Sequence, residues 1–199
     1  MALRAVFIDK DGTLLENVPY NVDPERVIFT PDAVAGLRRL IDSGFAIVFV
    51  SNQSGVARGF FDEQAVRAHF DHVLRLLAEQ GVSVLGYYYC PHLPQGSVMP
   101  YAVTCRCRKP WPGMFFAAAQ DLGIDLAASF AVGDILDDVE AANRAGCRSV
   151  LLDNGNETEW LDGRERGPDF RVSDLAEAAA VIIAASGNAD ESREVRHAF

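Results

Sequence analysis

Short runs of apolar residues alternate along the chain with longer segments whose apolar residues recur every three or four positions. The runs predict buried β-strands, and the periodic segments predict amphipathic helices. Strands are expected over residues 6–8, 45–50, 82–89, 129–132 and 148–152, with a short sixth strand after Asp169. The alternation predicts an α/β fold, a doubly wound parallel sheet with right-handed crossovers.

Capping residues give the expected bounds of the helices. Thr30 and Pro31 are typical of an N-cap followed by proline at the first helical position, and Gly44 ends that helix. Further helices are expected over residues 62–81, 112–122 and 174–186. Another helix is expected after the fourth strand and ends at Gly146. On the second helix, His69 and His72 lie three residues apart with no third ligand nearby. We interpret them as surface or packing residues.

Composition and charge restrict the function. The chain has 199 residues, of which 49% are hydrophobic and 23% charged, as expected for one globular domain. We place that domain at 1–186 and expect 187–199 to be a peripheral tail. The net charge of -10 argues against nucleic acid and anionic membranes as partners. Without a signal peptide or a spanning apolar run, we expect a cytoplasmic monomer acting on a small molecule.

Two carboxylates stand where the first strand ends. Asp9 follows the run Val6–Ile8 directly, and Asp11 precedes Gly12, which gives the freedom that a sharp turn needs. Ligands of open parallel sheets bind at the carboxyl ends of the strands. Carboxylates there can hold Mg²⁺, and one can attack phosphorus to form an aspartyl-phosphate. A plain acidic turn or a calcium loop would show the same short motif.

Polar residues also follow the second and fourth strands. The second ends in Ser51 and Asn52, within a glycine-bearing loop that reaches Gly59. Hydroxyl, amide and backbone N–H groups at a strand end suit phosphate binding, although a strand-to-helix loop can be capped by the same residues. The fourth strand ends in Asp134, with Asp138 one helical turn later.

Three cysteines and a histidine form two tight pairs. Cys90 and His92 are followed, after a twelve-residue spacer, by Cys105 and Cys107. Three thiolates and one imidazole match a closed structural Zn²⁺ site, in a zinc loop over 90–107. Disulfides are the alternative, which a reducing cytoplasm disfavours. Cys147 lies after a helix and is interpreted as an inert buried thiol.

Arg108 and Lys109 come directly after the zinc loop. A loop fixed by a metal ion can hold such cations rigidly. Arginine donates bidentate hydrogen bonds to phosphate, and lysine attracts phosphate as a compact positive charge. The two residues could instead offset the negative charge of a zinc ion bound by three thiolates.

These motifs occur in a fixed order: Asp9-Lys-Asp11-Gly-Thr13, Ser51, Lys109, and Gly133-Asp134-x-x-x-Asp138. The set resembles the four motifs of the haloacid-dehalogenase-like phosphatases, up to about Leu152. Within that superfamily, the loop from Ser51 to Gly59 and the Cys/His segment up to Met114 resemble the D-glycero-D-manno-heptose 1,7-bisphosphate 7-phosphatases. The resemblance implies a capless phosphatase of bacterial heptose synthesis, for lipopolysaccharide or related glycans.

The resemblance also implies a role for each residue. Asp9 would be the nucleophile, and Asp11 would protonate the leaving oxygen and then activate water. Mg²⁺ would bind Asp9, the Asp11 carbonyl and Asp134, with Asp138 behind them or reaching the metal through water. The residues expected to hold the phosphoryl group or the rest of a phosphorylated sugar are Thr13, Ser51, Asn52, Lys109, Arg58 and Arg108.

Two other functions remain open on the sequence. Zinc-containing histidinol-phosphate phosphatases share the metal loop but usually lack the sequence Ser54-Gly-Val-Ala-Arg-Gly59. A receiver-type signalling domain also has a phosphorylatable aspartate on a parallel sheet, normally on a middle strand and without a zinc loop. The chain departs from the heptose enzymes in its segment 153–168, and in Lys10, where arginine is common. We expect the Lys10 side chain to point away from the metal.

Overall fold

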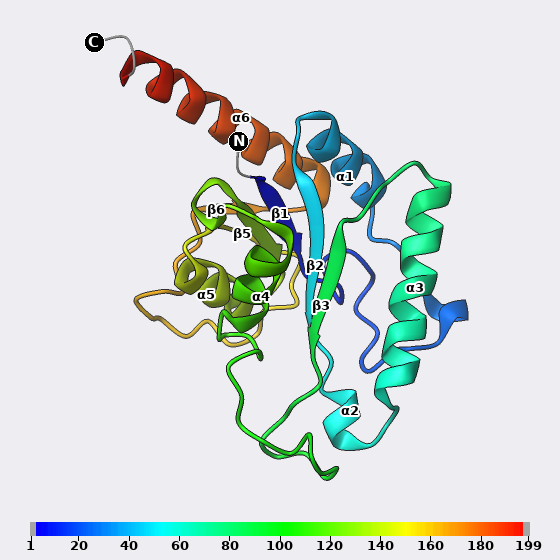
Figure 1. Cartoon of the computed structure of the whole chain (residues 1–199). Helices are drawn as coiled ribbons and strands as arrows, with labels where there is room; N and C mark the ends of the chain where they lie inside the picture. Colours follow the sequence, from blue (N-terminus) through cyan, green and yellow to red (C-terminus); the bar gives the residue numbers. More distant parts are fainter. Residues whose placement is uncertain (1–2, 197–199) are drawn as a thin grey trace.

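Six parallel strands form one twisted sheet in the order β3-β2-β1-β4-β5-β6 (Figure 1). The structure is a computed structural model that describes residues 3–196, with side chains up to Gly187. The strands are β1 (Ala5–Ile8), β2 (Ala46–Asn52), β3 (Gly86–Cys90), β4 (Phe130–Gly133), β5 (Arg148–Leu152) and β6 (Phe170–Val172). The predicted doubly wound parallel sheet is therefore confirmed.

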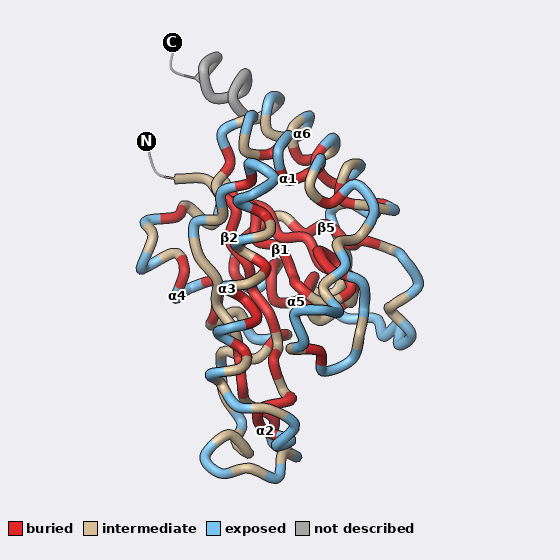
Figure 2. Tube along the Cα trace, turned by 90° about the vertical axis from the view of Figure 1, so that its right-hand side faces the viewer, coloured by how far each residue is buried: buried red, intermediate tan, exposed pale blue. Residues whose placement is uncertain are grey.

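Helices cover both faces of the sheet. Side chains of α1 (Ala33–Asp42), α3 (Glu63–Glu79) and α6 (Leu175–Arg196) pack on the face that carries Val6 and Ile8. Side chains of α4 (Gly113–Leu122) and α5 (Leu136–Ala145) pack on the opposite face, which carries Phe7. The strands are buried between the two layers (Figure 2). Successive residues of β1 thus enter opposite cores, as the period of a strand requires.

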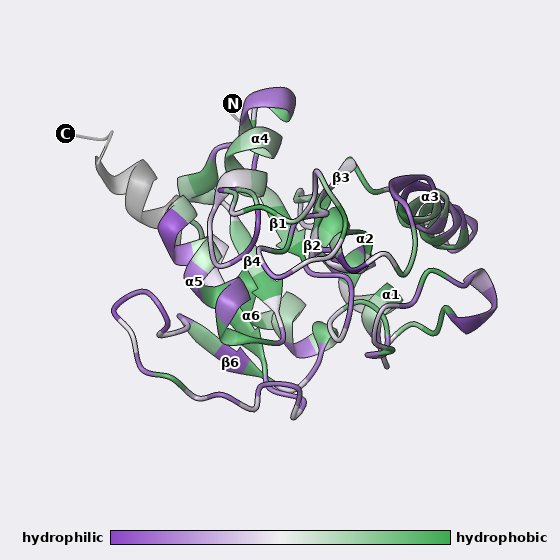
Figure 3. Ribbon diagram, turned by 90° about the horizontal axis from the view of Figure 1, so that it is seen from below, coloured by the Kyte–Doolittle hydropathy of each residue, from purple (hydrophilic) through white to green (hydrophobic). Residues whose placement is uncertain are grey.

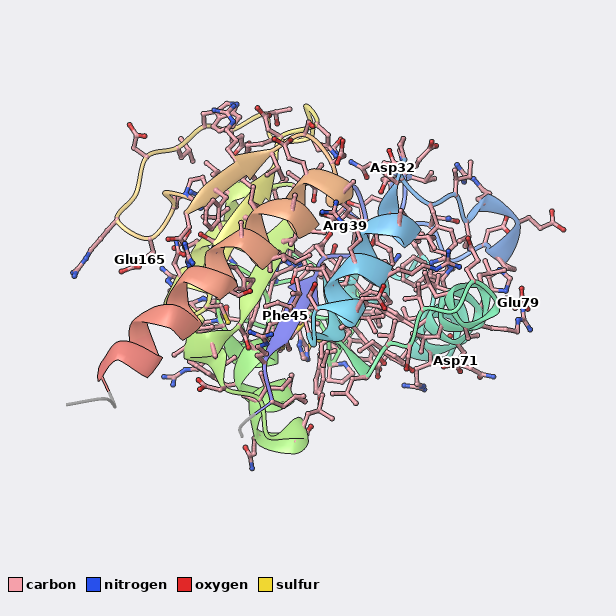
Figure 4. The ribbon with its side chains drawn as sticks, turned by 90° about the horizontal axis from the view of Figure 1, so that it is seen from above. Asp32, Arg39, Phe45, Asp71, Glu79 and Glu165 are labelled. Carbon is pink, nitrogen blue, oxygen red and sulfur yellow. The ribbon has the colours of Figure 1, made fainter. Side chains whose placement is uncertain are left out.

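Helices α1 and α6 pack closely on one face. The Arg39 side chain leaves α1 beside α6 (Figure 4), and its Nη1 donates a hydrogen bond to the Ala176 carbonyl at 3.2 Å. A Cβ at position 36 would lie 2.5 Å from the Leu175 carbonyl oxygen, so Gly36 allows this approach. Among residues 3–196, no helix has the length and apolar character needed to span a bilayer.

The order of the strands reverses beside β1. The chain runs from β1 through β2 to β3 on one side, and then returns to place β4 against the other side of β1. In such sheets the crevice for ligands opens at the carboxyl ends of the two strands where the order reverses. Seen from below, that edge is surrounded by hydrophilic loops around the apolar strands (Figure 3). Asp9 follows β1 and Asp134 follows β4 at this edge.

Several expected boundaries were wrong. Strand β3 begins at Gly86 rather than at residue 82, because its pairing with β2 begins at Val48. Thr30 does not cap α1: its hydroxyl donates to the Thr13 carbonyl at 2.7 Å, and Asp32 takes the N-cap position with a φ of 58°.

Other segments are more ordered than we expected. The loop after β2 contains a short helix, α2 (Gly55–Arg58), and the loop before α1 contains a 3₁₀ turn, Pro24–Arg26. A second 3₁₀ turn, Leu126–Ala128, precedes β4. Helix α6 continues to Arg196, beyond residue 186 where we ended it. The peripheral position of the tail 187–199 stays a prediction, because its side chains beyond Gly187 lie outside the description.

Candidate active site

Three buried carboxylates converge on one buried lysine at the crevice. Oxygen atoms of Asp9, Asp134 and Asp138 lie within 4.8 Å of one another. The Lys109 Nζ lies 2.5 Å from Asp9 Oδ1 and 2.5 Å from Asp138 Oδ1, and it donates to the Val50 carbonyl at 3.1 Å. The structure thus brings together the residues that follow β1, β4 and the zinc loop with one from α5.

The electrostatics of this cluster favour a bound cation. Burial raises the pKa of Asp9 well above its usual value, since the opposing effect of Lys109 is partly cancelled by Asp138 and Asp134. Burial and the neighbouring Asp138 raise the pKa of Asp134 to about 7. Burial alone would lower the pKa of Lys109, but the neighbouring Asp138 and Asp9 carboxylates outweigh this effect and raise it. One ammonium therefore leaves negative charge uncompensated, and buried carboxylate oxygens are the ligands that Mg²⁺ prefers.

Asn52 fixes the position of Lys109. Its Oδ1 accepts a hydrogen bond from the Lys109 backbone N–H at 3.0 Å, and its Nδ2 donates to the Lys109 carbonyl at 3.1 Å. Asn52 ends β2, so it ties the end of the zinc loop to the sheet. Ser51 is buried beside it, and its Oγ accepts a hydrogen bond from Gln53 at 2.9 Å.

Asp11 is held from two sides. Its Oδ1 lies 2.5 Å from Lys10 Nζ, and its Oδ2 accepts a hydrogen bond from Gln53 at 2.9 Å. The Lys10 side chain is 1% exposed and lies 3.4 Å from His69 Nε2. We expected Lys10 to point away from the metal site, and we interpreted His69 only as a surface or packing residue. Both lie buried behind Asp11, in a chain of contacts that orients its carboxylate.

Thr13 contributes to the carboxylate cluster. Its Oγ1 donates a hydrogen bond to Asp134 Oδ1 at 3.2 Å, so Thr13 holds that carboxylate from β4. Sequence reasoning missed four further polar residues at the site: Lys10, Gln53, Asn154 and Asn156. Gln53 could have been found, because it lies between Ser51 and the glycine-bearing turn of a loop already assigned to phosphate. The two asparagines follow β5, a strand end to which we assigned no chemistry.

A cavity of about 190 Å³ opens beside Asp11. It is lined from the two loops that follow β1 and β2, including Asn17, Tyr20, Asn52 and Gln53. The Arg58 guanidinium lies over the Tyr20 ring, 5.4 Å from its centroid. Arg58 therefore stands at the wall of this cavity, on a residue that lines it.

Arg108 lies beside the Cys/His cluster. Its Nη1 is 3.5 Å from the His92 carbonyl oxygen, and it does not line the cavity.

The cysteines and histidine of the zinc loop meet in one cluster. The ligand atoms of Cys90, His92, Cys105 and Cys107 lie within 4.8 Å of one another, and all the cysteines are free. The Cys107 Sγ lies 3.2 Å from both other sulfur atoms and 3.3 Å from His92 Nδ1. Hydrogen bonds from these neighbours, first Cys90, lower the pKa of Cys107 to about 5. The cluster is compatible with a zinc site, and Cys147 is buried elsewhere, as expected.

Comparison with known proteins gives the family. A family model described as HAD-hydrolase-like matches residues 106–178. The D-glycero-beta-D-manno-heptose-1,7-bisphosphate 7-phosphatase of Yersinia pestis is 38% identical over 183 residues, covering 92% of this chain and 97% of that protein. This chain belongs to the haloacid-dehalogenase-like phosphatases. It is an enzyme of the phosphoric monoester hydrolase class, and the predicted resemblance to the heptose-bisphosphate phosphatases is confirmed.

Other members of this phosphatase family support the assignment. The enzyme of the same name from Escherichia coli K12 is 42% identical over 76% of this chain and 79% of its own length. The D,D-heptose 1,7-bisphosphate phosphatase of B. bronchiseptica, solved with magnesium and phosphate, has a TM-score of 0.78 and 33% identity. That match covers 92% of this chain and 99% of the other. A HAD-like phosphatase from Mesorhizobium loti has a TM-score of 0.79 and 34% identity, over 92% and 87% of the two chains.

The buried His69 predicts a dependence of stability on pH. Burial, and then the nearby Lys10, lower the pKa of His69 from 6.5 to about 4. The unfolded histidine takes up a proton near its ordinary pKa, whereas the folded one does so only near the lowered value. The stabilising contribution is therefore present above the ordinary pKa and is lost as the pH falls toward the lowered one.

Replacing His69 with glutamine should remove this dependence. Between pH 7 and about pH 4.5, we expect the free energy of unfolding of the wild type to fall by about 2 kcal/mol more than that of His69→Gln. Urea denaturation at the two pH values measures the difference. His72→Gln, on the same helix but outside the core, is the control and should behave as the wild type. Equal pH dependence in wild type and His69→Gln would contradict the prediction.

Proposed function

We propose that this phosphatase is Mg²⁺-dependent and acts through an aspartyl-phosphate on Asp9. The observation that carries the proposal is the cluster of three buried carboxylates around Lys109, at the point where the strand order reverses. A carboxylate at that point can attack phosphorus, while Lys109 and Ser51 bind the phosphoryl oxygens. Asp11 stands two residues later with both oxygens held, so it is in place to transfer the proton.

The residues present fit a magnesium ion. Asp9, Asp134 and the Asp11 carbonyl would hold it, and Asp138, paired with Lys109, would stay behind these ligands. When bound, Mg²⁺ neutralises the repulsion between the nucleophilic carboxylate and the phosphate. The chain itself orients the attack: Thr13 holds the Asp134 carboxylate, and Lys109 holds that of Asp9.

Asp11 would act twice. It first donates a proton to the leaving alcohol oxygen as the bond to phosphorus breaks. The resulting carboxylate then takes a proton from the water that attacks the acyl phosphate. A receiver domain has no use for such a group beside its phosphoacceptor, and its phosphorylated form must persist. The position of Asp11 therefore favours a phosphatase.

The first prediction separates nucleophile from acid. Asp9→Asn should abolish phosphate release, because an amide cannot form the acyl phosphate, and Asp11→Asn should lower kcat by about 10²–10⁴-fold. Release of inorganic phosphate from p-nitrophenyl phosphate, with circular dichroism as a check on folding, measures both effects. Glu159→Gln, an exposed change in another loop, is the control. Near-normal turnover by a clean Asp9→Asn preparation would exclude this mechanism.

We also propose that Cys90, His92, Cys105 and Cys107 bind one structural Zn²⁺. Four protein ligands close the coordination shell, which leaves no position for substrate or water. The cluster lies directly before Lys109 in the chain, and Asn52 fixes the other side of that lysine. Zinc would therefore act on catalysis indirectly, through the rigidity of the loop that carries Arg108 and Lys109.

Removal of zinc should loosen that loop. Protein purified without added metal should contain about one zinc per chain by elemental analysis, the stoichiometry of a closed four-ligand site. A strong chelator should raise KM and lower kcat, while excess Mg²⁺ should not restore either. Cys147→Ser, which alters a thiol outside the cluster, should retain its zinc. Zinc-free protein with full activity would contradict the proposal.

For the substrate, we propose D-glycero-D-manno-heptose 1,7-bisphosphate, cleaved at the 7-phosphate in bacterial heptose and lipopolysaccharide precursor synthesis. The names of the similar enzymes and the cavity beside Asp11 support this choice. One phosphate would lie at the carboxylate cluster. The distal one could be bound by Arg58, which contacts Tyr20 of the cavity, or by Arg108, which lies outside the cavity beside the Cys/His cluster. Histidinol phosphate is the alternative, but its cationic amine would be repelled by arginines.

Arginine substitutions test the choice of substrate. Arg108→Ala should cost the bisphosphate about 1.5–3 kcal/mol in kcat/KM, the usual scale for a hydrogen bond to a charged group, and cost p-nitrophenyl phosphate much less. Arg58→Ala tests the second arginine in the same assay. Equal losses on both substrates would assign Arg108 to phosphoryl transfer or to folding. A higher kcat/KM of the wild type for histidinol phosphate would overturn the substrate but not the reaction.

A further inference from the structure

The loop after β5 reaches back over the carboxylate cluster. Asn154 Nδ2 donates a hydrogen bond to the Gly12 carbonyl at 2.7 Å. Asn156 Nδ2 donates to Asp134 Oδ2 at 2.8 Å and lies 3.5 Å from the same Gly12 carbonyl. These contacts join the loop to the turn after β1 and to the acid after β4, so the loop closes one side of the crevice.

The turn after β1 leaves space for this contact. Gly12 has a φ of 88°, and a Cβ there would lie 2.1 Å from Asp134 Oδ2 and 2.7 Å from Asn156 Nδ2. Any larger residue at position 12 would push both groups away. The close approach of Asn156 to Asp134 is therefore built into the motif that carries the nucleophile.

The hydrogen bonds fix which way the Asn156 amide points. Its nearest neighbours, Asp134 Oδ2 and the Gly12 carbonyl, are both acceptors, so the NH₂ group must face them. Its Oδ1 lies on the other side, 3.4 Å from the Nδ2 of Asn17 in the cavity wall. A flipped amide would place its oxygen against two acceptors, so only one orientation is stable.

Asn156 completes the restraints on the Asp134 carboxylate. Thr13 Oγ1 donates to Oδ1 and Asn156 donates to Oδ2, so each oxygen has one donor and rotation of the group is restricted. Each oxygen keeps lone pairs free for a metal ion, because a carboxylate oxygen accepts more than one bond. The loop itself is anchored by Glu157, whose Oε2 accepts the Leu136 backbone N–H at 2.6 Å at the start of α5.

We propose that Asn156 is a positioning residue that orients Asp134 to bind the divalent cation. The inference rests on the metal dependence proposed above, and it assigns a role to a residue of the segment 153–168. Hydrogen bonds to metal ligands typically change metal affinity by about 10–100-fold. An uncharged amide suits this role because it restrains the carboxylate without changing the charge available to the metal.

The test measures metal binding directly. Zinc-loaded wild type and Asn156→Ala are titrated with Mn²⁺ and with Mg²⁺ by calorimetry, without substrate, and their melting temperatures are recorded with and without Mg²⁺. We expect Asn156→Ala to bind both ions at least about tenfold more weakly, and to gain less stability from Mg²⁺ than the wild type does. Thr158→Ala, exposed in the same loop, is the control and should bind as the wild type.

The outcomes separate the inference from the proposed function. A wild type that binds neither ion defeats the metal-dependent mechanism itself. A wild type that binds normally, together with an Asn156→Ala variant of equal affinity, overturns only the role of Asn156. Asn156→Leu keeps the branched shape of the side chain but removes the donor, so it replaces Asn156→Ala if that variant fails to fold. Its metal affinity should fall by the same factor.

Discussion

The site depends on three buried carboxylates that share one buried lysine, Lys109, which pairs with two of them. With Asp9, Asp134 and Asp138 ionised and Lys109 protonated, two negative charges stay uncompensated in a buried place. Such an arrangement is costly for a folded protein unless a cation is bound or protons are taken up. The raised pKa values of Asp9 and Asp134 correspond to the uptake of protons. A bound divalent cation would compensate the charge instead. The same imbalance supports the proposal that the cluster binds a divalent cation, which would keep Asp9 ionised for attack.

The fold brings these charges together by placing each at the carboxyl end of a strand or on the loop that follows. Asp9 and Asp134 come from neighbouring strands, so the sheet sets their separation through the β1–β4 pairing. Lys109 has no strand of its own. It reaches the cluster because the Cys/His segment and Asn52 fix the loop before and around it. The Cys/His segment and Asn52 therefore position this lysine without a strand or helix of its own.

The sequence predicted the residues whose place follows from strand order. Asp9, Ser51 and Asp134 each stand directly after an apolar run, so a parallel sheet must gather them at one edge. The contacts of Lys10 with Asp11 and His69 were not predicted, because the partners of a side chain at a tight turn depend on what packs there. Asn156 was missed because its partner lies 22 residues earlier in the chain and its loop has no periodicity. The start of β3 was misplaced because an edge strand extends only as far as its one neighbour pairs with it.

Two asparagines perform the same task on opposite sides of the crevice. Asn52 holds the cation of the cluster through the backbone of Lys109, and Asn156 holds one of its anions through Asp134. A charged residue in either place would alter the charge balance of the cluster, because its charge would act across a buried, weakly screened site. An amide offers directional hydrogen bonds with no net charge. Positioning and charge are thereby separated: amides and the hydroxyl of Thr13 set the geometry, while the carboxylates and Lys109 set the electrostatics of the cluster.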